Sequence, residues 1–202
     1  MGYGKIKMKK ASMKPVDTKK MTKDVKKFMK TMKYKYGSFK MNMKYEFSKL
    51  LLKKMTDDDR IFFITADLGF KLWDEIQKKH PDRCIIMGAS EQLAMGAGVG
   101  LALDGKIPVV YSITNFLIYR PFEIIRNYIN YENLPVKMIG SGRDKDYSHD
   151  GISHWSEDDK DVMSLFKNVK TYHPNNIMEL NVAMKFMFDY DIKTPYYLNL
   201  RR

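Results

Sequence analysis

The chain has 202 residues and a hydrophobic share of 44%, which suits one globular domain with an appendage. Its one cysteine, Cys84, excludes a disulfide framework within the chain and favours a reducing compartment, so we expect a cytoplasmic protein in which this thiol is buried. No apolar run approaches the ~18 residues that span a bilayer, and the N-terminus lacks the apolar core of a secretory signal.

The basic character of the chain is confined to its N-terminus. Residues 1–40 hold fourteen Lys and two Asp, which accounts for the whole net charge of +12 and leaves the remainder neutral. The polar stretch to Lys20 is typical of disorder, whereas residues 21–32 space apolar side chains as an amphipathic helix would. We therefore predict a basic, largely disordered tail over residues 1–41. Nucleic acid or an anionic surface would bind through this tail, if at all.

From residue 42 onward, short apolar runs alternate with longer periodic segments, after a first helix through about residue 56. The predicted strands are Ile61–Ala66, Cys84–Met87, Ile107–Ile113, Val136–Ile139, Val169–Tyr172 and Tyr196–Leu200. The predicted helices lie near 69–80, 90–104, 116–132, 156–168 and 175–190. This alternation indicates an α/β domain over residues 42–202, with a mostly parallel six-stranded sheet flanked by helices on both faces.

Parallel sheets of this kind bind ligands at the carboxyl ends of their strands, so the loops there are the candidate site. Four loops carry polar or small residues in a fixed order. They are Ala66-Asp67-Leu68-Gly69, then Ser90-Glu91-Gln92 with a Gly/Ala-rich run behind it, then Phe116 through Arg120 to Glu123, then Asp150-Gly151-Ile152-Ser153-His154.

This ordered set resembles the pyrimidine-binding domain of the transketolase family, and the resemblance covers residues 42–202. It implies the thiamine-diphosphate-binding fold and a transketolase-like enzyme that transfers a two-carbon ketol unit between sugar phosphates. The segment around His154 departs from the family pattern: Ser153 stands for the usual Thr, Ile152 for Pro, and Trp155 for a smaller or polar residue.

Glu91 is the predicted catalytic carboxyl group. Thiamine chemistry needs the imino tautomer of the cofactor's aminopyrimidine, and a carboxyl group hydrogen-bonded to the opposite ring nitrogen favours that tautomer. From residue type alone another interpretation stands beside this one: Ser90 caps the following helix and Glu91 only complements the helix dipole.

The resemblance assigns the other site residues. Phe116 would stack on the aminopyrimidine, with Ile113 and Tyr119 completing an apolar slot, and Asp67 and Leu68 would also contact the cofactor. His154 would act on the reacting sugar. His149, Ser153 and Arg120 are substrate candidates, although Arg120 and Arg126 also have the spacing to pair with Glu123 on one helix. The Gly96, Gly98 and Gly100 series lies inside a helix, which favours close packing over phosphate binding.

The family's Gly-Asp-Gly segment, which anchors Mg²⁺ and the diphosphate, does not occur in this sequence. We therefore expect no metal ligand here, and a partner chain that supplies the Mg²⁺ and diphosphate half in an α2β2 assembly, with homodimerisation through this domain. The chain ends at Arg202, where the domain's last strand is expected to end. Two alternatives remain: a catalytically inactive binding or regulatory module, and a β-type subunit of a 2-oxo-acid dehydrogenase.

Overall fold

The computed structural model describes residues 42–69 and 71–202. The predicted tail, residues 1–41 with the amphipathic segment 21–32, lies outside the described residues. Within the described residues no helix has both the length and the apolar character needed to cross a membrane.

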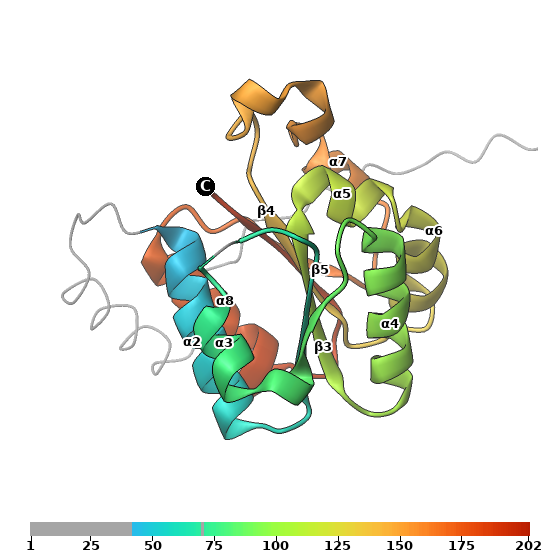
Figure 1. Ribbon diagram of the computed structural model, residues 1–202. Coiled ribbons are helices and arrows are strands. Elements are labelled where there is room, and N and C mark those ends of the chain that lie inside the picture. The colour runs from blue at the N-terminus through green and yellow to red at the C-terminus, as the bar shows by residue number, and fades with distance from the viewer. Residues whose placement is uncertain (1–41, 70) are drawn as a thin grey trace, which may run out of the picture.

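The described residues form one six-stranded sheet whose neighbouring strands all pair in parallel (Figure 1). The strand order is β2-β1-β3-β4-β6-β5, so β1, β3, β4 and β6 lie in the interior of the sheet and β2 and β5 at its edges. The strands are β1 Ile61–Thr65, β2 Cys84–Ile86, β3 Ile107–Ile113, β4 Lys137–Ser141, β5 Lys170–Tyr172 and β6 Tyr196–Leu200. The predicted strands are confirmed, and the predicted sheet is parallel throughout.

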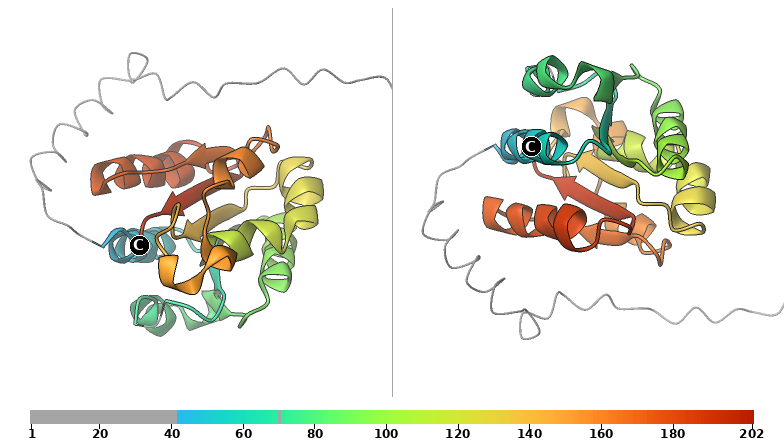
Figure 2. Two further views of the ribbon diagram at one scale, coloured as in Figure 1. Left: turned by 90° about the horizontal axis from the view of Figure 1, so that it is seen from above. Right: turned by 90° about the horizontal axis from the view of Figure 1, so that it is seen from below.

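Helices cover both faces of this sheet, as Figures 1 and 2 show, and each face has its own apolar core. One face carries α2 (Met43–Asp57), α3 (Asp74–Lys79) and α8 (Ile177–Lys185), and α8 continues as a wider helical turn over Phe186–Tyr190. The other face carries α4 (Glu91–Leu103), α5 (Thr114–Tyr119), α6 (Phe122–Ile124) and a π-helical turn over Ile125–Asn130. Because helices bury both faces of the sheet, nearly every side chain along its strands has to be apolar.

Two predicted helices are shorter than expected. The helix predicted near 69–80 begins only at Asp74, because the preceding residues form a turn in which Gly69 has a φ of 81° and the indole of Trp73 donates to the Leu68 carbonyl at 3.1 Å. The helix predicted near 156–168 is limited to α7 (Asp159–Met163). The residues before α7 belong to the long loop that follows β4.

The glycines of α4 confirm the packing interpretation at one position. A Cβ on Gly98 would lie 2.9 Å from Cγ2 of Val110 on β3, so only glycine lets this helix approach the sheet so closely. A Cβ on Gly100 would meet no atom within 4 Å. Cys84 is buried at the start of β2, as expected.

Candidate functional site

The candidate site lies at the carboxyl ends of the central strands. Glu91 is the first residue of α4, and its side chain is 4% exposed. Ser112, near the end of β3, donates its hydroxyl to Oε1 of Glu91 at 2.9 Å, while Arg120, directly after the C-terminal end of α5, pairs with Oε2. Both carboxylate oxygens are therefore held, which sets the orientation of this side chain.

Ser90 does not cap α4. Its hydroxyl donates to the carbonyl of Met87 rather than accepting from a helix N–H. The interpretation in which Ser90 caps the helix is wrong, because the hydroxyl turns back into the loop after β2. Glu91 still lies at the positive end of the helix dipole, where a carboxylate is favoured.

Arg120 occupies the space between Glu91 and Phe116. Its guanidinium carbon lies 3.9 Å from the centroid of the Phe116 ring, and the same group makes the ion pair with Glu91. The expected alternative, pairing of Arg120 or Arg126 with Glu123, is wrong. Arg120 reaches across to α4, and Arg126 donates to Asn127 at 2.8 Å.

His154 joins this group from the loop after β4. Its ring meets the Phe116 ring edge-on, with 4.9 Å between the centroids. The loop is held here by Asn115 of α5, which donates to the carbonyl of Ser153 at 3.2 Å, and the Ser153 hydroxyl lies 2.9 Å from Nδ1 of His154. Glu91, Arg120, Phe116, Ser153 and His154 therefore form one cluster from three separate segments: the start of α4, α5 with the residue after it, and the loop after β4.

The other predicted site residues make their contacts with residues outside this cluster or are exposed. Tyr119 is 42% exposed and its hydroxyl bonds to Asp158, so its place in an apolar slot with the half-buried Ile113 stays a prediction. Leu68 packs against the core on the α2 face, and Asp67 is exposed. His149 is also exposed, in the short 3₁₀ turn Ser148–Asp150.

Three residues that sequence reasoning missed support the cluster. Ser112 orients Glu91, Asn115 holds the Ser153 carbonyl, and Tyr147 places its ring 6.2 Å from the ring of His154. One signal was available for Ser112: it is a polar residue at the carboxyl end of an otherwise apolar strand, where parallel sheets present ligand-binding groups.

The described part of the chain offers no obvious metal centre. Among residues 42–69 and 71–202, no group of three or more His, Cys, Asp or Glu side chains is arranged to hold a metal ion. Asn176 caps α8 by accepting from the Glu179 N–H, in the role that a residue of this type has at a helix start.

Comparisons with known proteins place this geometry in a family. The model of the family "Transketolase, pyrimidine binding domain" matches residues 39–202. The 6-deoxy-6-sulfo-D-fructose transketolase subunit SqwH of Clostridium sp. (strain MSTE9) is 31% identical over 154 residues, which are 76% of this chain and 47% of that protein. An apulose-4-phosphate transketolase subunit of Actinobacillus succinogenes is 32% identical over 123 residues, covering 61% of this chain and 39% of the relative.

A solved structure gives the same result for the fold. The structure titled "Split gene transketolase, inactive beta4 tetramer" is 28% identical and superposes with a TM-score of 0.67, covering 78% of this chain and 50% of that one. The chain thus spans about half the length, or less, of these similar proteins.

Proposed function

The chain belongs to the transketolase pyrimidine-binding domain family, and we propose that it holds the aminopyrimidine of thiamine diphosphate in a split transketolase-like enzyme. The reaction that we propose is transfer of a two-carbon ketol unit between sugar phosphates. The observation that carries this proposal is the buried carboxylate of Glu91, oriented at both oxygens and separated from the Phe116 ring by a flat guanidinium.

The position of that guanidinium supports the fit of the cofactor. A guanidinium is planar, stacks on an aromatic face and donates N–H groups to a carboxylate. An aminopyrimidine ring is likewise planar and stacks on an aromatic face, and its ring nitrogen donates an N–H to a carboxylate once that nitrogen is protonated. The space between Glu91 and Phe116 therefore suits the ring, provided that Arg120 moves away when the cofactor binds.

Each residue of the cluster then has a defined task. Glu91 would hold a proton at the ring nitrogen that faces it, and Ser112 would keep the carboxylate in the required orientation. Phe116 would stack against the ring and exclude water from one side of it. When bound, the cofactor supplies the carbon nucleophile that takes up the two-carbon unit. His154, whose ring is held against Phe116, would donate or accept a proton at a substrate hydroxyl.

The substrate class that we propose is a ketose donor and an aldose acceptor with an anionic tail. The names of two relatives support it, since one is a sulfofructose transketolase subunit and another an apulose-4-phosphate transketolase subunit. Arg120, once released from Glu91, is a cation near the site that would meet such a tail. His149 and Ser153 stand on the same loop as His154 and would contact the sugar.

The partner that we propose is a diphosphate-binding transketolase-like chain that supplies the Mg²⁺ site in an α2β2 assembly. The names of the relatives, which call them subunits, and the absence of a Gly-Asp-Gly segment from this sequence support it. Homodimerisation through this domain and a cytoplasmic location belong to the same proposal.

The test is co-expression of the chain with the product of the neighbouring open reading frame, followed by assay of ketol transfer with thiamine diphosphate and Mg²⁺. We expect Glu91→Gln to lower kcat by roughly 100-fold or more, the scale of a lost general acid–base group. Glu123→Gln is the matched control, because Glu123 is an exposed carboxylate that receives, among the hydrogen bonds of the described residues, only a long one of 3.5 Å from Asn127.

Unchanged turnover in Glu91→Gln would show that this carboxylate has no catalytic role. The inactive binding module predicts that no pairing of chains yields turnover, and the 2-oxo-acid dehydrogenase alternative predicts decarboxylation of a 2-oxo acid instead. The transketolase names among the relatives favour ketol transfer over both alternatives.

A further inference from the structure

The loop between β4 and α7, residues 142–158, carries three of the proposed substrate residues, so an inference about it rests on the proposed function. Figure 1 shows this loop rising from the carboxyl end of the sheet. Its tip is poorly buried: Ile152 is 80% exposed, and His149 and Ser153 are exposed as well. A loop with so little buried surface opens easily unless its ends are held.

The first end of the loop is held by Arg143, which is 3% exposed. Its Nη2 donates to the carbonyls of Pro174 at 2.9 Å and Asn199 at 2.8 Å, and its Nη1 donates to Oδ1 of Asn175 at 3.0 Å. These partners lie on the segment after β5 and on β6, so the guanidinium ties the start of the loop to two other parts of the chain.

The last end of the loop is held by Asp159, the first residue of α7, which is 2% exposed. Its Oδ2 accepts three hydrogen bonds: from Nε2 of His173 at 2.8 Å, from the hydroxyl of Tyr197 at 2.8 Å and from Nδ2 of Asn199 at 2.5 Å. Burial acts to raise the pKa of Asp159, but these bonds outweigh it and hold the pKa below its usual value. The carboxylate is therefore ionised, and its Oδ2 is held by three donors.

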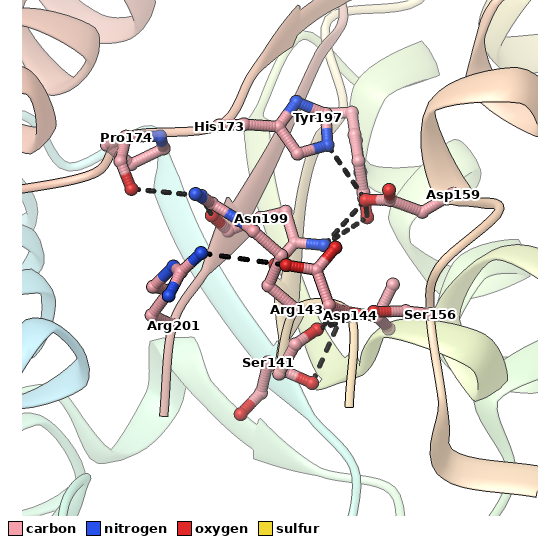
Figure 3. A network of polar contacts seen from close by, with 12 residues as sticks. Ser141, Arg143, Asp144, Ser156, Asp159, His173, Pro174, Tyr197, Asn199 and Arg201 are labelled. Carbon is pink, nitrogen blue, oxygen red and sulfur yellow. Dashed lines mark hydrogen bonds and ion pairs between the residues drawn. The ribbon is translucent and has the colours of Figure 1, made fainter. Parts of the chain in front are cut away.

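Asn199 of β6 joins the two ends. Its carbonyl accepts a hydrogen bond from the Arg143 guanidinium, and its side-chain amide donates one to Asp159, as the close view in Figure 3 shows. Because β6 pairs with β4 on one side and β5 on the other, this anchor belongs to the interior of the sheet. Between the ends, Ser156 donates from its N–H to the Asp144 carbonyl at 2.8 Å and from its hydroxyl to the Gly142 carbonyl at 3.0 Å.

We propose that Asp159 and Asn199 are positioning residues of the enzyme, which clamp the base of the loop 142–158 to β6 so that His154 is held against Phe116. Neither residue belongs to the Glu91–Phe116 cluster. Their effect passes through the loop, because His154 lies only five residues before Asp159. The clamp fixes the backbone at both ends, and the bond from Asn115 to Ser153 then has to hold only the tip.

The clamp predicts a local effect that a general loss of stability would not produce. In the full chain assembled with its partner, we expect Asp159→Ala to speed amide hydrogen exchange over residues 144–155 by roughly 10- to 100-fold, the range for losing hydrogen bonds to a charged group. Exchange in α4 and β3 should stay unchanged. Asp159→Asn retains an acceptor oxygen and should recover much of the protection.

The same variants should separate the kinetic constants. We expect kcat to fall by roughly tenfold or more, while half-saturation by thiamine diphosphate stays constant, because Glu91 and Phe116 are untouched. Asp161→Ala is the control: it removes an exposed carboxylate from the same turn of α7. His173→Phe removes one of the three donors and gives a milder variant should Asp159→Ala fail to fold, with a smaller rise in exchange over the same segment.

Three results would overturn the clamp: unchanged exchange over residues 144–155, an equal rise across the whole domain, or an unchanged kcat in an enzyme whose loop has loosened. The exchange measurement needs no substrate. A failure of the proposed ketol transfer, seen as an inactive wild-type assembly, is therefore distinguishable from a failure of the clamp.

Discussion

The guanidinium of Arg120 lies over the ring of Phe116, with 3.9 Å between its central carbon and the ring centroid, and it pairs at the same time with Glu91. This arrangement places a cation of the chain in the space that we propose for the aminopyrimidine. Cofactor binding must therefore displace Arg120. The apparent affinity for the cofactor is then proportional to the fraction of molecules in which the guanidinium has left this space.

The first prediction concerns this competition. We expect Arg120→Met to tighten binding of thiamine diphosphate to the assembled enzyme by roughly two- to tenfold, a small factor because the arginine side chain is 43% exposed and its ion pair is screened. The same variant should raise KM for an anionic sugar, since the released guanidinium is then missing. Calorimetric titration and steady-state kinetics measure the two effects.

Arg126→Met serves as the control for Arg120, because Arg126 is exposed and bonds only to its neighbour Asn127 among the hydrogen bonds of the described residues. It should change neither constant. Weaker cofactor binding in Arg120→Met would contradict the competition and would make the arginine a partner of the bound cofactor instead.

A second prediction uses two glycines of one helix. Gly98→Ala should lower the free energy of unfolding by about 1–3 kcal/mol, because the new methyl group would lie 2.9 Å from Cγ2 of Val110 in a packed interior. Gly100→Ala should leave stability unchanged or raise it by up to about 1 kcal/mol, since its Cβ meets open space and alanine favours the helix. Urea unfolding of the two variants compares them directly, and equal stabilities would disprove the close approach of α4 to β3.

The third prediction is a pH dependence from Lys137. This lysine is fully buried at the start of β4, where its amine donates to the carbonyls of Ile192 at 2.8 Å and Thr194 at 2.6 Å. Burial lowers its pKa to about 7, and the nearby Asp191 offsets only part of this. Between pH 7 and about 10.5, the ordinary pKa of a lysine, the unfolded chain therefore binds a proton at this site that the folded chain has lost.

The sign follows from that difference in protons. Because the unfolded state binds more of them, the free energy of unfolding should rise with pH by up to about 1.4 kcal/mol per pH unit between pH 7 and about 10.5, and the contribution should level off outside this window. Lys137→Met lacks this contribution, although it leaves two carbonyls without their amine donor. Guanidinium unfolding of both proteins at several pH values checks the slope. Parallel curves would show that the amine stays charged in the folded protein.

A fourth prediction concerns the basic residues 1–41, which lie outside the described residues. Deleting them should abolish retention on a polyanion such as heparin, because residues 41–202 carry no net charge. For the full chain, binding should weaken at least tenfold between about 50 and 200 mM salt. A full-length variant with Lys23, Lys26, Lys27 and Lys30 changed to Gln tests whether charge is the cause. If the truncated chain, without residues 1–41, is still retained on heparin at moderate salt, the anion-binding surface lies on the folded domain.

Local pattern in the sequence was enough to determine the strands and the starts of several helices. The runs Ile107–Ile113 and Tyr196–Leu200 coincide with β3 and β6, because a strand buried on both faces must be apolar at nearly every position. Glu91 could also be placed at the start of a helix after a strand, because the order of elements along the chain is a local property.

Which residues meet across the fold was decided only by the tertiary structure. Arg120 has an acidic residue three positions away at Glu123, yet its ion pair is with Glu91, 29 positions away. Asp159 and Asn199 are separated by 40 positions and become partners only because β6 lies beside β4 in the sheet. Sequence periodicity states which face of an element is buried, but the partner of a polar side chain depends on strand order and on the path of the loops, and these result from packing of the whole domain.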